Sequence, residues 1–267
     1  MPSSHKDQVR AHVRERYAGI AKSGGSCGCS SSCCQPDALL NPGASAQLGY
    51  SQEELAAVPE GANMGLGCGN PQAIAALRPG ETVVDLGCGG GFDCFLAAHR
   101  VGQKGRAIGV DMTPEMVHKA RANAAKGKIK NVDFRLGEIE HLPVADATAD
   151  VILSNCVINL SPDKPQVFAD AFRVLKPGGR LAISDVVAVA PIPARVKKNL
   201  RAHSGCIAGS ATVSETERML KKAGFSGIRI HVKEQSKEFI KDWFPGSGAE
   251  KYVRSATIEA VKNGAKT

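Results

Sequence analysis

Residues 82–93 read TVVDLGCGGGFD, and this stretch decides the fold. The apolar run TVVDL has the length and composition of a buried strand, and glycines follow it at positions 87, 89, 90 and 91. Glycine lets the backbone turn tightly and approach a ligand where a Cβ would clash. A helix pattern begins at Phe92, and the start of a helix leaves backbone N–H groups unpaired. The stretch therefore predicts a nucleotide-type loop at the carboxyl end of the first strand of an open α/β sheet.

The same alternation of strands and helices continues after this loop. Further strands are predicted at 105–111, 131–138, 149–156 and 178–187, with helices at 92–100, 113–125 and 164–175. After an insertion at 188–211, a helix is predicted at 214–225 and two last strands at 227–234 and 253–262. Buried strands that alternate with helices are typical of a doubly wound, mostly parallel sheet with right-handed crossovers. The predicted fold class is α/β and Rossmann-like, with seven strands.

The chain before the loop has a different character. Its first 20 residues predict a helix, because Val9, Val13, Tyr17 and Ile20 follow three-to-four spacing. Residues 22–36 are rich in Gly, Ser and Cys and predict a flexible segment. A short helix is predicted from Ser51, which would cap it. We expect an arm with a Cys-rich segment (1–50), a cofactor-binding core (51–190) and a carboxyl-terminal region with a lid insertion and two strands (191–267).

Composition excludes several classes of protein. The chain is 43% hydrophobic and 22% charged, as in ordinary soluble proteins, and no apolar run is long enough to span a bilayer. Its start is charged and lacks the apolar centre of a signal peptide, so we expect a cytoplasmic protein. The net charge is +8, but aromatic residues are only 4% and are not interleaved with the basic clusters, which argues against nucleic-acid binding. Nothing resembles a dimerisation helix, so we expect a monomer.

The spacing of the loop identifies the kind of nucleotide. The dinucleotide pattern G-x-G-x-x-G fails, because its sixth position is Phe92, whereas D-x-G-x-G-x-G fits from Asp85 to Gly91. A second carboxylate, Asp111, closes the next strand and could accept both ribose hydroxyls. This set resembles the class I S-adenosylmethionine-dependent methyltransferases. The resemblance implies that Asp85 contacts the methionine end of the cofactor and Asp111 its ribose.

Three later segments support this resemblance: GEIEHLP (137–143), SNCVINL (154–160) and RVLKPGGRLAISD (173–185). The first resembles the adenine-flanking position of the family. The cofactor-binding residues implied are Asp85, Gly87, Gly89, Gly91, Asp111, Met112, Glu138, Ile139 and Asn155. Other interpretations stay open: Gly90 could be a turn glycine, Met112 a core residue and Glu138 a helix cap.

The usual acid/base group of a methyltransferase is missing. A His or carboxylate is expected near the end of the fourth strand, but Asn155 and Cys156 stand there. His141 is the nearest histidine, and we interpret it as a polar loop residue. Cys156 itself could be a packing residue, a nucleophile or a soft-metal ligand.

Nine cysteines make thiol chemistry a hypothesis from composition alone. Their odd number and the reducing compartment argue against a disulfide framework. Cys88 and Cys94 are interpreted as packing residues. Cys68, Cys156 and Cys206 stand singly in separate loops without the paired spacing of a zinc site. Three thiolates gathered from three loops suit a trigonal, thiophilic metalloid better than zinc.

Five segments together resemble the arsenite methyltransferases: GLGCGNP (65–71), DLGCGGGFDCFLAA (85–98), GVDMTPEM (109–116), SNCVINLSPDK (154–164) and SGCIAG (204–209). The resemblance implies that Cys68, Cys156 and Cys206 bind As(III) and that S-adenosylmethionine methylates it, with arsenite and methylated trivalent arsenicals as substrates. The arsenic lone pair would take the methyl group directly, so no proton has to be removed. One departure is that RAHSG, without an aromatic residue, precedes Cys206.

The resemblance also implies that a fourth, N-terminal cysteine reduces the methylated arsenic by forming a disulfide. Cys34 is our first choice and Cys33 the next, while Cys27 and Cys29 stay open. External thiols such as glutathione, or thioredoxin, would then restore the enzyme.

Two other functions remain open from the sequence. One is a methyltransferase of a small organic acceptor whose cysteines are incidental. The other is a non-enzymatic metalloid-binding protein, although no helix-turn-helix or other output module of a sensor is recognisable.

Overall fold

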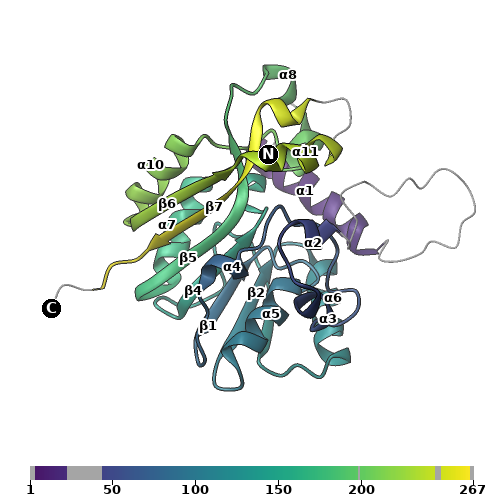
Figure 1. The fold of residues 1–267 in the computed structure, drawn as a ribbon, viewed down its shortest axis with the longest axis vertical. Helices are drawn as coiled ribbons and strands as arrows, with labels where there is room; N and C mark the ends of the chain where they lie inside the picture. Colours follow the sequence, from purple (N-terminus) through teal and green to yellow (C-terminus); the bar gives the residue numbers. More distant parts are fainter. Residues whose placement is uncertain (1–3, 23–43, 198, 244–247, 265–267) are drawn as a thin grey trace, which may run out of the picture.

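The computed structural model describes residues 4–22, 44–197, 199–243 and 248–264 (Figure 1). Its centre is one seven-stranded sheet with the strand order β3-β2-β1-β4-β5-β7-β6. The strands are β1 Thr82–Leu86, β2 Arg106–Asp111, β3 Val132–Leu136, β4 Ala149–Asn155, β5 Leu175–Ala188, β6 Ser226–Lys233 and β7 Val253–Val261. The first five run parallel, and β7 is antiparallel to both of its neighbours. The predicted fold class is confirmed.

The strand order reverses between β1 and β4, which pair in parallel with Leu86 opposite Ser154. Open α/β sheets bind ligands in the crevice outside the carboxyl ends of the strands at such a reversal. Here β1 ends in the glycine loop and β4 ends at Asn155, next to Cys156. The topology thus places the two most informative segments of the sequence side by side.

Helices cover both faces of the sheet, as the doubly wound pattern predicts (Figure 1). Side chains alternate along each strand, so Val84 and Leu86 pack on one face and Val83 on the other. Helices α7 (Lys164–Val174) and α10 (Val213–Ala223) contribute to the first cluster. Helices α5 (Phe92–Val101) and α6 (Pro114–Lys126) contribute to the second.

Strand β5 begins earlier than its sequence pattern indicates. The glycine pair at 178–179 predicts a start at 178, but the strand extends from Leu175, which pairs with Ala149 across a register shift. The structure also contains short helices that have no clear periodicity in the sequence: α2 Ala44–Gln47, α3 Gln52–Ala56, α4 Gln72–Ala75, α8 Ala194–Lys197, α9 Leu200–Ser204 and α11 Lys237–Trp243, and the 3₁₀ turns Ile158–Leu160, Glu234–Ser236 and Ala249–Lys251. Of these only α3 was predicted, and Ser51 and Glu54 form its capping box.

The amino-terminal arm is a helix, α1 (His5–Lys22), that packs against α6 and α9. Its apolar positions Val9, Val13 and Ile20 are buried, in agreement with the predicted spacing. Figure 1 shows α1, α8 and α11 gathered at one end of the sheet. Within the described ranges, no helix combines the length and apolarity needed to cross a bilayer.

A third apolar cluster lies at this end of the molecule. It joins Val9 and Val13 of α1 to Ile207 of the insertion and to Ile240 of α11. Three buried cysteines belong to the same cluster: Cys68, Cys156 and Cys206. Elements from both ends of the chain therefore enclose the cysteines that the sequence singled out.

Candidate functional site

The glycine loop after β1 has the backbone that its composition predicts. Gly87, Gly89 and Gly91 all have positive φ, at 67°, 51° and 93°, and Gly91 is the N-cap of α5. This left-handed region is open to glycine and costly for other residues. A Cβ at Gly87 would also collide with the side chain of Val157, just after Cys156. The loop is thus pressed against the segment that follows β4.

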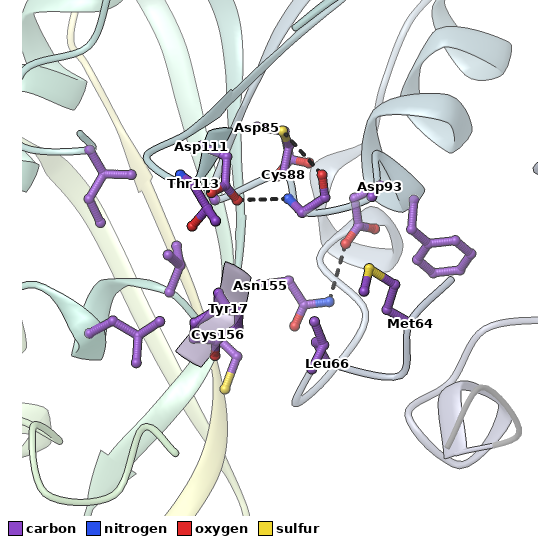
Figure 2. Close-up of a pocket in the computed structure, with 18 of the residues that line it drawn as sticks. Tyr17, Met64, Leu66, Asp85, Cys88, Asp93, Asp111, Thr113, Asn155 and Cys156 are labelled. Atoms are coloured by element: carbon purple, nitrogen blue, oxygen red, sulfur yellow. Dashed lines mark hydrogen bonds between the residues drawn. The ribbon is translucent and has the colours of Figure 1, made fainter. Parts of the chain in front are cut away.

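Asp111 holds the loop to the end of β2. Its carboxylate accepts the backbone N–H of Gly89 at 3.0 Å and that of Thr113 at 2.8 Å (Figure 2). Burial raises the pKa of Asp111, although these two hydrogen bonds oppose the shift. Asp111, which the family resemblance assigns to the ribose of the cofactor, is therefore held in place by the glycine loop itself.

Two further carboxylates are buried beside the loop. Asp85 is the penultimate residue of β1 and is 3% exposed, and burial raises its pKa well above the usual range. Asp93 accepts hydrogen bonds from the hydroxyl of Tyr50 at 2.8 Å and from Asn155 at 3.2 Å, and burial raises its pKa as well. A buried negative charge is costly without a partner, so this region favours a ligand that carries positive charge or donates hydrogen bonds.

An open pocket of about 1080 Å³ lies over these groups (Figure 2). Eight residues expected at the active site line it: Asp85, Gly87, Gly89, Asp111, Met112, Ile139, Asn155 and Cys156. The sequence did not anticipate other parts of the wall, among them Tyr17, Tyr50, Met64, Asp93 and Leu160.

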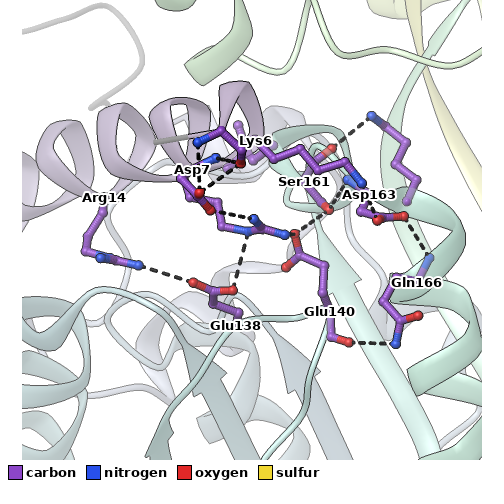
Figure 3. Close-up of polar contacts among 12 residues, drawn as sticks. Lys6, Asp7, Arg14, Glu138, Glu140, Ser161, Asp163 and Gln166 are labelled. Atoms are coloured by element: carbon purple, nitrogen blue, oxygen red, sulfur yellow. Dashed lines mark hydrogen bonds and ion pairs between the residues drawn. The ribbon is translucent and has the colours of Figure 1, made fainter. Parts of the chain in front are cut away.

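Two residues predicted to bind the cofactor are not part of the pocket wall. Gly91 lies behind it as the N-cap of α5. The carboxylate of Glu138 instead forms ion pairs with Arg10 and Arg14 of α1, each at 3.3 Å (Figure 3). Nothing local in the sequence reveals that a helix more than 120 residues away neutralises this side chain.

Glu140 is the better buried acidic residue of the same segment. Its side chain is 4% exposed and lies on the pocket wall, where it pairs with Arg10 at 3.0 Å and accepts a hydrogen bond from Ser161 at 2.8 Å (Figure 3). Arg10 is only 17% exposed itself. Because removing one partner of such a buried pair leaves an uncompensated charge, the pair fixes α1 over the pocket.

The structure brings together the three cysteines that stand apart in the sequence. Cys206 donates its thiol hydrogen to the carbonyl of Cys156 at 2.9 Å, and Cys68 donates to the carbonyl of Ser184 at 3.4 Å. The sulfur atoms of Cys68 and Cys156 and a carboxylate oxygen of Asp185 all lie within 4.8 Å of one another. Exposures of 0% for Cys68, 8% for Cys156 and 3% for Cys206 show that all three are buried. We call these three residues the thiol cluster.

Two members of the thiol cluster have an unusual backbone. Cys156 and Cys206 have φ values of 59° and 62°, which are uncommon for residues other than glycine. Asp185 supports the first of these turns, since its carboxylate accepts the backbone N–H of Ile158 at 3.0 Å. Burial raises the pKa of Asp185 to about 6. Strained backbone of this kind persists where surrounding contacts fix it, often at functional sites.

The thiols are held in their neutral form. Burial raises the pKa of Cys68 to about 11. For Cys156, the hydrogen bond with Cys206 lowers the pKa, but the contact with Cys68 and burial outweigh it, and the pKa lies well above its usual range. The hydrogen bond with Cys156 and then burial raise the pKa of Cys206. A cluster of neutral thiols favours an uncharged acceptor over a divalent cation.

The remaining predicted residues are placed as follows. Cys94 is buried in the core, where its thiol donates to Asp85 at 3.4 Å, and Cys88 is buried but reaches the pocket wall. His141 is exposed, and no histidine is found among the described residues of the wall. Four cysteines lie outside the described residues: Cys27, Cys29, Cys33 and Cys34.

Comparison with known proteins agrees with this site. A family of methyltransferase domains matches residues 77–224. An arsenite methyltransferase from Halobacterium salinarum is 52% identical over 265 residues, which cover 96% of this chain and 67% of that protein. The arsenite methyltransferase of Mus musculus is 32% identical over 240 residues, covering 85% of this chain and 61% of its own.

The chain belongs to the arsenite methyltransferase family.

Solved structures place this arsenite methyltransferase family member among class I methyltransferases. An arsenic(III) S-adenosylmethionine methyltransferase from Chlamydomonas reinhardtii has a TM-score of 0.61 at 31% identity, covering 87% of this chain and 75% of that one. A phosphoethanolamine N-methyltransferase from Haemonchus contortus reaches the same TM-score at 18% identity, covering 80% and 53%, and shows the shared fold alone. The alignment with an arsenite methyltransferase from Aquipseudomonas alcaligenes, 41% identical over 171 residues, covers 61% of this chain and 49% of that protein.

The close approach of Gly87 to Val157 predicts that alanine destabilises the protein more at Gly87 than at Gly89. Gly87→Ala should lower the free energy of unfolding by about 2–5 kcal/mol, because the left-handed backbone and the collision with Val157 both contribute. Gly89→Ala is the matched control: its φ is also positive, but no atom lies within 4 Å of the added Cβ, so about 1–2 kcal/mol is expected. Urea denaturation measures both. Equal losses would contradict the close packing of the loop on the segment after β4.

Proposed function

We propose that the protein transfers the methyl group of S-adenosylmethionine to trivalent arsenic held by Cys68, Cys156 and Cys206. The observation that carries this proposal is the position of Cys156, which belongs to the thiol cluster and also lines the pocket. An acceptor held by the cluster would therefore face a donor bound in the pocket. The arsenite methyltransferases among its relatives support the same reaction.

The neutral thiols suit the proposed acceptor. Arsenous acid, As(OH)₃, exchanges its three hydroxyl groups for three thiols and releases three water molecules, with no net change in bound protons. High thiol pKa values therefore do not oppose binding, because each thiol proton leaves with a hydroxyl group. A divalent cation would instead require thiolates and would release protons.

The pocket has features that fit S-adenosylmethionine as the donor. When bound, this group supplies an activated methyl on a cationic sulfur. Gly87 and Gly89 leave room for close approach of a ligand to the backbone. The carboxylates of Asp85 and Asp111 on the pocket wall would accept its hydrogen bonds and offset its positive charge.

The proposed chemistry needs no general base. An arsenic atom bound to three sulfurs keeps a lone pair, so methylation requires no proton to be removed. The protein has to align donor and acceptor and exclude water, and alignment alone can account for several orders of magnitude in rate. The described part of the pocket wall contains carboxylates and thiols but no histidine.

We further propose that the N-terminal cysteines complete the turnover. Addition of a methyl cation leaves arsenic formally oxidised by two electrons, and two thiols supply two electrons when they form a disulfide and release two protons. Cys34 or Cys33 would provide one of these thiols, and external thiols, glutathione or thioredoxin would reduce the disulfide. This part of the proposal rests on the family resemblance, since both residues lie outside the described ranges.

Replacing the thiols one at a time tests the proposed acceptor site. Cys68→Ser, Cys156→Ser and Cys206→Ser should each lower arsenite methylation by at least about 100-fold, because arsenic loses one of its three ligands next to the donor. Labelled S-adenosylmethionine and separation of the arsenic products measure the rate. Cys94→Ser replaces a buried thiol away from the cluster, keeps a hydrogen-bond donor to Asp85 and should retain most of the activity. Full activity in any of the three serine variants would sink the three-thiol site.

The exchange stoichiometry also predicts the pH dependence of binding. Between about pH 6.5 and pH 8.5, arsenite affinity should stay nearly flat, because the thiols remain protonated below their raised pKa values and exchange releases no protons. Zinc, measured in parallel by titration calorimetry, should bind more tightly as the pH rises, because it displaces thiol protons. An arsenite affinity that climbs with pH as zinc affinity does would show that thiolates, not thiols, are the reacting species.

A further inference from the structure

We propose that Tyr17 of helix α1 is a positioning residue that closes the junction between the cofactor pocket and the thiol cluster. The inference rests on the proposed function and extends it to a residue far from the sequence motifs. Tyr17 lines the pocket and also packs against the apolar cluster that contains the three cysteines. Among the described residues shared by the pocket wall and this cluster, Tyr17 carries the one aromatic ring.

The surroundings of Tyr17 place it next to both reactants of the proposed transfer. Tyr17 and Cys156 both line the pocket and are labelled on the same side of it in Figure 2. Burial raises the pKa of Tyr17 well above its usual range, and Cys206, Cys156 and Asp111 act on it in the same direction. The phenol is therefore neutral at any pH where the protein functions. Its ring contributes apolar surface and not charge to the junction.

The hydroxyl group of Tyr17 reaches towards the loop that carries Cys206. It lies 3.5 Å from the carbonyl oxygen of Ser204, at the end of α9 and two residues before Cys206. This distance is at the limit of a hydrogen bond. We therefore assign the positioning effect of Tyr17 mainly to its ring and not to its hydroxyl. Because the ring packs against the cluster that contains Cys206, it can limit how far the Cys206 loop moves from the pocket.

Helix α1 is fixed firmly enough to hold a side chain in place. On one side, Arg10 pairs with the buried Glu140 on the pocket wall, and Lys6 pairs with Asp163 at the start of α7 (Figure 3). Val9 and Val13 bury their side chains in the cluster around the cysteines. Tyr17 follows Val13 by about one helical turn and so shares its buried face.

A ring at this position has two physical consequences for the transfer. It excludes water from the path between donor and acceptor, and its face attracts a nearby cation. Both effects act on alignment and desolvation, whereas the acceptor is held by sulfur and the donor by carboxylates and the loop. Loss of the ring should therefore slow the transfer step without abolishing the binding of either reactant.

The test compares Tyr17→Leu and Tyr17→Phe with the wild-type protein in single-turnover methylation of arsenite. Tyr17→Leu should lower the single-turnover rate by about 10- to 100-fold, the range expected when reactants are misplaced by about 1 Å. Tyr17→Phe keeps the ring and should stay close to the wild-type rate. Titration calorimetry with S-adenosylmethionine, and with arsenite, should give affinities close to those of the wild type for both variants. If Tyr17→Leu does not fold, Tyr17→Met provides the same comparison.

Val9→Ala is the matched control, because Val9 is buried in the same cluster from the same helix but does not line the pocket. It should lower the melting temperature and leave the single-turnover rate unchanged. Equal single-turnover rates for the wild type and Tyr17→Leu would overturn the inference. An equal loss of rate in Val9→Ala would also overturn it, because the effect would then belong to the docking of α1. If the wild-type protein forms no methylated arsenical, the proposed function itself fails, and the inference with it.

Discussion

The side-chain amide of Asn155 joins the two halves of the site. Its oxygen accepts the backbone N–H of Cys68 at 3.0 Å, which fixes the loop that delivers the first thiol. Its nitrogen lies 2.9 Å from the carbonyl of Gly69, 3.0 Å from the hydroxyl of Tyr50 and 3.2 Å from the carboxylate of Asp93. One partly buried amide thus connects the end of β4, the Cys68 loop and the first turn of α5. The relative position of pocket and thiol cluster depends on this residue.

The charges around the site follow one pattern. Near the glycine loop, Asp85 and Asp93 are buried and Asp111 is partly buried, and desolvation raises the pKa of each. Near the thiol cluster, burial and mutual contact keep the sulfurs protonated. A cationic donor on the acidic side and uncharged arsenous acid on the side of the neutral thiols would each meet a favourable environment. Under the proposed function, this division explains how one cavity can distinguish its two reactants.

Much of this arrangement could be predicted from the sequence, because its signals are local. Strong periodicity gave the strands and the long helices, and the glycines of the loop needed the positive φ that they have. The parallel topology then required the loop after β1 and the segment after β4 to meet. The convergence of Cys68 and Cys206 on Cys156 agrees with the family resemblance, but no spacing rule could have placed a cysteine of the insertion there.

The contributions of α1 could not be predicted, because they arise from contacts between segments more than 100 residues apart. Glu138 has the position of a cofactor ligand in the sequence, yet the two arginines of α1 neutralise it. Tyr17 showed only the apolar spacing of a helix and gave no sign that its ring reaches the pocket. Tyr50 and Asp93 likewise acquire their roles through Asn155, a tertiary contact.

Arsenic X-ray absorption spectroscopy of the protein with one equivalent of arsenite tests the central claim most directly. The account predicts an arsenic atom bound to three sulfur atoms and to no oxygen, since Cys68, Cys156 and Cys206 are already gathered in one buried cluster. Two sulfur ligands with one retained oxygen would contradict it. A mixture of sulfur and oxygen ligands that stays the same after excess arsenite is removed would also contradict it.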